Sequence, residues 1–225
     1  MPNHNLAHPD QWVISHTNQI GKVTRFGYDE RGLKVAETNA NSEVVLFKYD
    51  SGGNLTNLMD GKLHNTYWKY DQEGRVTNKL DHALAESFRY TYDPEDRLLT
   101  RWTPEKGTTA YAYDAVGNLT NVNYSASTDL NFRYDASNRL TNMVDASGTS
   151  AFTYTGYGAL ASEDGPWTSD TVTFAYNSGR VRSSAVLQQV SGVAWTNSYV
   201  YDPAMRLTNI TSPAGVFAHE YDSTA

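Results

Sequence analysis

Tyr49-Asp50-Ser51-Gly52-Gly53-Asn54-Leu55-Thr56-Asn57 is a nine-residue motif that the chain repeats along its length. It returns almost unchanged at residues 113–121, and with substitutions at 70–78, 92–100, 134–142 and 201–209. Its tyrosine belongs to a series with one member every 20 to 25 residues: Tyr28, Tyr49, Tyr70, Tyr92, Tyr113, Tyr134, Tyr154, Tyr176, Tyr201 and Tyr221. We refer to these as the ladder tyrosines. A fixed period of this length indicates tandem copies of one small supersecondary unit.

Each copy of the motif predicts a β-hairpin. An aromatic residue stands two positions before nine of the ten ladder tyrosines, and this spacing places both rings on one face of a strand. The Asp-x-x-Gly that follows fits a type I turn, whose fourth residue is expected to take a left-handed backbone. Asn138 and Asp96 are tolerable there, whereas Met205 is a misfit. Apolar residues expected to face inward follow each turn, namely Leu33, Leu55, Val76, Leu98, Leu119, Leu140, Leu160 and Leu207.

The positions predicted to carry this structure are the ladder tyrosine, the turn aspartate and the turn glycine of each repeat. They are Tyr28, Asp29, Gly32, Tyr49, Asp50, Gly53, Tyr70, Asp71, Gly74, Tyr92, Asp93, Tyr113, Asp114, Gly117, Tyr134, Asp135, Tyr201 and Asp202. Valine at Gly53 or Gly117 should cost more stability than valine at Gly148, which lies outside the turn register.

The predicted fold is therefore all-β: tandem hairpins of about 21 residues forming a coiled antiparallel sheet of about 20 strands. Residues 1–19 are expected to be a partly flexible lead-in, and residues 20–225 an array of about ten units, truncated in its last repeat. The pattern is interrupted at residues 161–171 by Gly165-Pro166-Trp167. At residues 182–196 the 25-residue spacing predicts a longer loop or hairpin extension. A ring closed from about 20 strands would be only about 30 Å across, so we expect an open or self-filled coil.

Composition excludes several classes of function. The formal charge is −7 and no basic stripe is visible in the sequence, which argues against nucleic-acid binding. The absence of cysteine removes disulfides, thiolate nucleophiles and cysteine-ligated metals. No apolar run is long enough for a membrane span or a signal peptide.

Candidate chemical motifs are weak, and we expect no catalytic, cofactor or metal site. Gly156-Tyr157-Gly158-Ala159-Leu160-Ala161 matches a dinucleotide fingerprint but occupies a predicted repeat turn instead of opening a helix. His4 and His8 have a metal-ligand spacing without an evident third ligand. The aspartates, one per repeat, are better explained as turn caps than as calcium ligands.

The recurring Tyr-Asp pair, found at residues 28, 49, 70, 92, 113, 134, 201 and 221, resembles that of the Rhs or YD-repeat proteins. The resemblance covers roughly residues 20–225. It implies a β-strip that spirals into a hollow shell, as in bacterial Rhs toxins, the shell components of Tc toxins and the teneurins. It also implies two partners, the remainder of a longer YD-repeat chain and an enclosed C-terminal cargo domain, and a secreted or cell-surface parent protein, more often bacterial.

Two functional hypotheses follow. The first is a non-enzymatic structural segment of an encapsulating shell. The alternative is a carbohydrate-binding or cell-surface adhesion module that uses outward aromatic residues such as Trp68, Trp102, Trp167 and Trp195.

Overall fold

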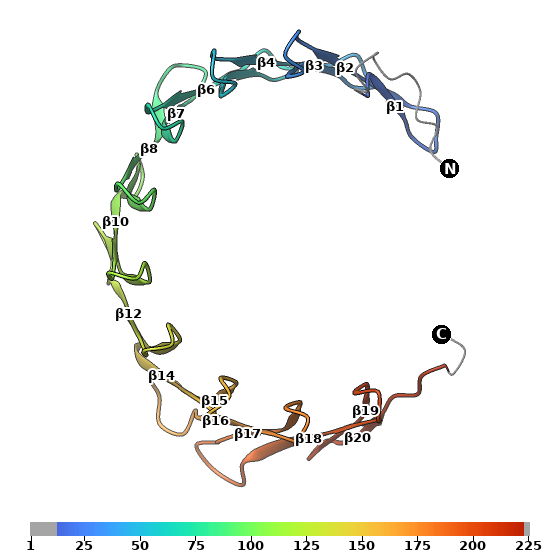
Figure 1. Ribbon diagram of the computed structural model, residues 1–225, viewed down its shortest axis with the longest axis vertical. Coiled ribbons are helices and arrows are strands. Elements are labelled where there is room, and N and C mark those ends of the chain that lie inside the picture. The colour runs from blue at the N-terminus through green and yellow to red at the C-terminus, as the bar shows by residue number, and fades with distance from the viewer. Residues whose placement is uncertain (1–12, 223–225) are drawn as a thin grey trace. The chain divides into compact units, whose positions relative to one another are not determined.

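The computed structural model describes residues 13–222, in which all regular secondary structure is β-strand (Figure 1). Twenty strands occur in this range, and the pairings between them are antiparallel and join strands that are consecutive in the chain. The prediction of an all-β chain built from tandem hairpins is confirmed. The first twelve residues of the expected lead-in, with His4 and His8, lie outside the described range.

The chain divides into two units, which meet between Ala110 and Tyr111. The strands of the first unit are β1 (Ser15–Thr17), β2 (Val23–Tyr28), β3 (Lys34–Thr38), β4 (Val44–Tyr49), β5 (Leu55–Met59), β6 (Asn65–Tyr70), β7 (Val76–Leu80), β8 (Glu86–Tyr92) and β9 (Leu98–Thr103). Strand β10 (Gly107–Tyr113) begins in this unit and runs across the boundary.

The second unit contains β11 (Leu119–Tyr124), β12 (Leu130–Tyr134), β13 (Leu140–Asp145), β14 (Gly148–Tyr154), β15 (Leu160–Asp164), β16 (Val172–Tyr176), β17 (Arg182–Leu187), β18 (Trp195–Tyr201), β19 (Leu207–Ser212) and β20 (Gly215–Ala218). The longer connection predicted within residues 182–196 is present at residues 188–194, and a second one, which was not predicted, lies at residues 165–171.

A β-bulge marks the ladder tyrosines of most repeats. In the hairpin of β4 and β5, Lys48 lies opposite Asn57 but Tyr49 lies opposite Leu55. One residue of β5 between these two pairs is therefore unpaired across the strands. The same shift occurs at Tyr28, Tyr70, Tyr92, Tyr134, Tyr154, Tyr176 and Tyr201. Bulges increase the local right-handed twist, which keeps a long sheet from lying flat.

Strand register separates two faces of the sheet. The ladder tyrosines and the aromatic residues two positions before them share one face, which we name the tyrosine face. The residues between them, such as Lys48 and Lys69, lie on the other side, which we name the opposite face. All strand–strand contacts join chain neighbours, so within each unit the strands form a single layer.

This single layer leaves little that is fully buried, although the chain is long enough to bury a sizeable core. Among the described residues, the buried apolar side chains are Leu80, Val122 and Ala185. The apolar residues expected to face inward are half-buried instead. The physical reason is that no second layer covers either face within a unit, so packing comes from neighbours on the same face.

Candidate functional site

The repeated Tyr-Asp turns are the most regular feature of the structure. In the turn Asp50–Gly53, the Asp50 carbonyl accepts a hydrogen bond from the Gly53 amide at 3.2 Å. The Asp50 carboxylate accepts the Asn54 backbone amide on Oδ1 at 2.9 Å and the Asn54 side-chain amide on Oδ2 at 3.0 Å. One aspartate thus caps the turn and fixes the first side chain of the next strand.

The other Tyr-Asp turns repeat this arrangement. Oδ1 of the turn aspartate accepts the backbone amide four residues later at Asp29, Asp71, Asp93, Asp114, Asp135 and Asp202. Arginine replaces asparagine as the partner of Oδ2 at Arg75, Arg97, Arg139 and Arg206, with Nε donating at 2.6–2.8 Å. In these turns the residue after the fourth turn residue supplies a side-chain donor, which both asparagine and arginine provide. In the first repeat that residue is Leu33, and Arg31 donates to Oδ2 of Asp29 instead.

The fourth turn residue has the left-handed backbone that the sequence predicts. Gly32, Gly53, Gly74, Gly117 and Gly158 have φ between +82° and +96°. Asp96 and Asn138 take the same region at +62° and +59°, and so do Met205 and Arg180, at +61° and +60°. Met205 therefore follows the register at a conformational cost that asparagine or glycine would avoid.

Gly148 is not a valid reference position for the predicted effect of valine at Gly53 and Gly117. Gly148 also has a positive φ, of +135°, and a Cβ at this position would lie 2.8 Å from Cβ of Pro166. Valine at Gly148 is therefore strained both by its backbone and by Pro166, although the residue lies outside the motif.

The ladder tyrosines connect each hairpin to the one before it. The Tyr70 hydroxyl donates to the Leu55 carbonyl at 2.7 Å, and the Tyr134 hydroxyl donates to the Leu119 carbonyl at 2.9 Å. Equivalent bonds at 2.7–3.1 Å reach back from Tyr28, Tyr49, Tyr92, Tyr154, Tyr176, Tyr201 and Tyr221. The acceptor is in most cases the carbonyl of the apolar residue that follows the preceding turn.

Arginines strengthen this connection between repeats. Besides binding Asp71, Arg75 donates through its NH1 group to the Asp93 carbonyl at 3.0 Å and to the Asp96 carboxylate at 2.7 Å. The same guanidinium lies over the Tyr92 ring, 4.9 Å from its centroid. Arg139 over Tyr154 and Arg206 over Tyr221 repeat the stacking at 4.6 Å.

These contacts change the pKa values of the groups involved. The side-chain amides of Asn54 and Asn118 lower the pKa of Asp50 and Asp114, and the Arg139 guanidinium does the same for Asp135. Burial, with a contribution from the charge of Asp50, raises the pKa of Tyr70. Asp50, Asp114 and Asp135 are therefore held as carboxylates, and the Tyr70 hydroxyl is held as a donor.

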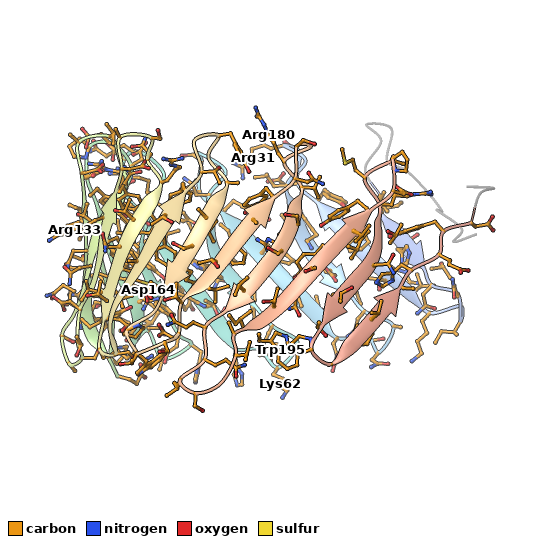
Figure 2. All side chains as sticks on the ribbon, turned by 90° about the horizontal axis from the view of Figure 1, so that it is seen from below. Arg31, Lys62, Arg133, Asp164, Arg180 and Trp195 are labelled. Carbon is orange, nitrogen blue, oxygen red and sulfur yellow. The ribbon has the colours of Figure 1, made fainter. Side chains whose placement is uncertain are left out.

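A second set of turns was not predicted. These return turns close the hairpins at the other edge of the strip, as the positions of Arg31 and Lys62 in Figure 2 illustrate. Asp60 Oδ1 accepts the amides of Lys62 and His64, and Leu63 is left-handed at φ +66°. Turns at Asn39 and Asp81 match it. The sequence does carry a signal, because these capping residues stand ten positions after Asp29, Asp50 and Asp71.

Two of the tryptophans proposed as sugar-binding residues, Trp68 and Trp102, lie on opposite faces of the first unit. Trp68 lies on the tyrosine face, with Lys79 Nζ 6.0 Å from its ring. Trp102 lies on the opposite face under Arg89. Trp195 donates its indole N–H to Asn197, and Trp167, 67% exposed, stands in the 165–171 connection. The aromatic residues of the ladder strands are half-buried.

Other candidate chemistry does not form a reactive site. The Gly156–Gly158 stretch is a turn between antiparallel strands, with no helix to receive a pyrophosphate. Within residues 13–222, no three His, Asp or Glu side chains converge as metal ligands. A recess of about 450 Å³ lies between two return turns of the first unit and is lined by Glu43, Asp60 and His64 among others. No helix in the described range could cross a membrane.

The expectation that the chain has no basic stripe is wrong for the first unit. Arg25, Lys48, Lys69 and Arg89 are exposed, and register places all four on the opposite face. They are 20 to 23 residues apart in the chain, so no run of basic residues reveals them.

Comparison with known families and structures agrees with this geometry. The teneurin YD-shell family matches residues 82–209, and the RHS repeat family matches residues 8–44. No protein of curated function matches the chain.

Among solved structures, the fold is similar to that of TcdB2-TccC3-TEV, with a TM-score of 0.57 and 19% identity. TcdB2-TccC3 without its hypervariable C-terminal region and the Tc holotoxin pore of Photorhabdus luminescens give 0.57 at 18% identity. Each match covers 95% of this chain but only 12% of the other. At such identity these structures establish the fold alone. The family match spans more than half of this sequence, and the chain therefore belongs to the teneurin YD-shell family.

Proposed function

We propose that this chain is a non-enzymatic wall segment of a hollow shell, formed together with the remainder of a longer YD-repeat protein. The observation that carries the proposal is the hydrogen bond from a ladder hydroxyl to a backbone carbonyl about 15 residues earlier, as from Tyr70 to Leu55 and from Tyr134 to Leu119. Within each unit these bonds join successive hairpins into a continuous strip without a second layer or a core.

A wall requires continuity and impermeability more than it requires a reactive pocket. Backbone hydrogen bonds pair each strand with its neighbours in the chain. The Tyr-Asp turns and the return turns connect the strand ends along the two long edges of the sheet. The cargo of the proposed shell is a C-terminal domain of the same longer protein, which is secreted or displayed at the cell surface. The similarity to Tc structures supports the fold of such a wall.

The test is to express the complete reading frame that contains this segment and to digest the product with protease. We expect the region beyond the array to resist cleavage while the array is folded, and to be cleaved once the array is unfolded by urea. Cleavage of that region at the same rate before and after unfolding would contradict the proposal, and so would a product with no region beyond the array.

A further inference from the structure

The opposite face of the first unit carries a row of four cations that the repeat does not require. Lys69 lies directly across from Arg89, with Asn78 of the intervening strand between them. Two strand spacings separate these two residues by about 10 Å. Lys48 lies two strands further on, and Arg25 two strands beyond it, each displaced along its strand. The row thus crosses β2, β4, β6 and β8, one strand from each repeat.

Arg25 and Lys48 have no carboxylate partner among the described residues, whereas Lys69 and Arg89 both interact with the charge of Glu86. No carboxylate of the described residues lies within ion-pair distance of Arg25, Lys48 or Lys69, and the side chains are exposed. Arg89 pairs with Glu86, which is also bonded to Asn78. The charge of the row is therefore only partly neutralised within the unit.

The second unit shows that the fold does not need cations here. Lys48 and Lys69 stand immediately before a ladder tyrosine, and in the second unit the same position is taken by Ala112, Thr153, Ala175 and Val200. Arg133 is the one cation at this position in that unit (Figure 2). The row is a local reversal of sign in a chain of net charge −7.

We propose that this cationic row binds an acidic, extended polypeptide segment. A chain in extended conformation advances about 3.3 Å per residue, so carboxylates three residues apart match the roughly 10 Å between Lys69 and Arg89, and wider carboxylate spacings are needed to reach Lys48 and Arg25, which are offset along their strands. Half-buried apolar and aromatic side chains, including Leu46, Met59 and Tyr67, lie on the same face between the cations. They provide contact area for the apolar residues of such a segment.

A polypeptide fits this surface better than a nucleic acid does. The net charge of −7 repels a polyanion at long range, and four cations are few for a phosphate backbone. A short acidic segment needs only the local field of the row, and because the cations are exposed its binding should weaken as salt screens them.

The test measures binding of a fluorescein-labelled oligoglutamate to the full chain by fluorescence anisotropy at low salt. Lys48→Thr/Lys69→Thr removes two cations and leaves the direct Arg89–Glu86 ion pair intact, although Lys69 also interacts with the charge of Glu86, and threonine occurs naturally at the equivalent position 153. We expect this variant to lose roughly fivefold or more in affinity. Arg133→Thr is the matched control in the second unit and should change the affinity less than twofold.

Several outcomes would overturn the proposal: no saturable binding to oligoglutamate, equal losses in the double variant and the Arg133→Thr control, or tighter binding of a single-stranded oligothymidine of equal charge. Circular dichroism establishes that each variant is folded. If the double variant does not fold, Lys69→Gln alone should still weaken binding, and unchanged affinity in that variant would count against the row.

Discussion

At single residues, backbone conformation separates glycines that look alike in the sequence. Gly156 and Gly158 belong to the same turn, but only Gly158 has a left-handed backbone, at φ +91°. A Cβ at Gly156 would meet no atom within 4 Å, so side-chain space does not confound the comparison. We expect Gly158→Val to lower the free energy of unfolding by about 1–3 kcal/mol more than Gly156→Val. Urea denaturation of both variants measures this, and equal losses would show that the turn register is irrelevant to stability.

The carboxylate of a turn aspartate should make folding sensitive to acid. Hydrogen bonds from Asn118 lower the pKa of Asp114 in the folded protein, whereas an unfolded aspartate titrates near pH 3.9. A lowered folded pKa means that the stabilisation is complete above about pH 5 and is lost as the pH falls through the lowered value. Asp114→Asn should therefore have a lower free energy of unfolding than the parent chain at pH 7. Below pH 4 the difference between the two free energies of unfolding should become smaller.

Thermal melts across this pH range provide the measurement. Glu105→Gln is the control, because Glu105 is an exposed turn carboxylate to which no described residue donates a hydrogen bond. A gap between Asp114→Asn and the parent that stays constant from pH 7 to pH 3 would contradict the assigned role of the turn carboxylate.

At the scale of the hairpin, the hydroxyl of a ladder tyrosine forms a hydrogen bond between one repeat and the repeat before it. Tyr134→Phe removes the bond to the Leu119 carbonyl and keeps the ring. A net loss of about 1 kcal/mol is expected in chemical denaturation. Tyr199→Phe is the control, because Tyr199 stands on the same face of the strip two positions before a ladder tyrosine. A loss of the same size in both variants would assign the effect to the removal of any tyrosine hydroxyl on this face and not to the inter-repeat bond.

The hairpins and their Tyr-Asp turns were predictable from the sequence, because their signals lie within nine consecutive residues. Period-two aromatics define the strand face, and Asp with Gly three positions later defines the turn. The return turns were missed because their fourth residue is Ser42, Leu63 or Leu84, none of which is a usual left-handed residue. Their capping residues Asn39, Asp60 and Asp81 recur ten positions after the aspartates of the Tyr-Asp turns, and this recurrence is the sequence signal for a second set of turns.

Contacts between repeats were not predictable in the same way. The acceptor of a ladder hydroxyl is a backbone carbonyl about 15 residues earlier, and every residue type has one. The cationic row escaped for a related reason, since charge patterning was judged along the chain, whereas the row runs across the strands. Sequence shows which face a residue is on, but the neighbours on that face follow only from the register.

At the scale of the whole molecule, the first and last strands govern how this 225-residue segment associates when it is expressed alone. Strand β20 pairs with β19 alone among the described strands, and its Val216 and Phe217 are 64% and 56% exposed. An apolar strand with a free edge invites pairing with another chain. We expect sedimentation velocity to show association that increases with concentration and that Val216→Lys weakens. A strictly monomeric species at high concentration would contradict this expectation.

The backward reach of the ladder hydroxyl also bears on how such a gene changes length. Removing residues 50–70 would join Tyr49 to Asp71 and restore a Tyr-Asp pair. Tyr49 would keep its acceptor on Lys34, and Tyr92 would keep its acceptor on Val76. Unequal recombination between neighbouring copies can therefore lengthen or shorten the protein by a whole unit, without a compensating mutation elsewhere.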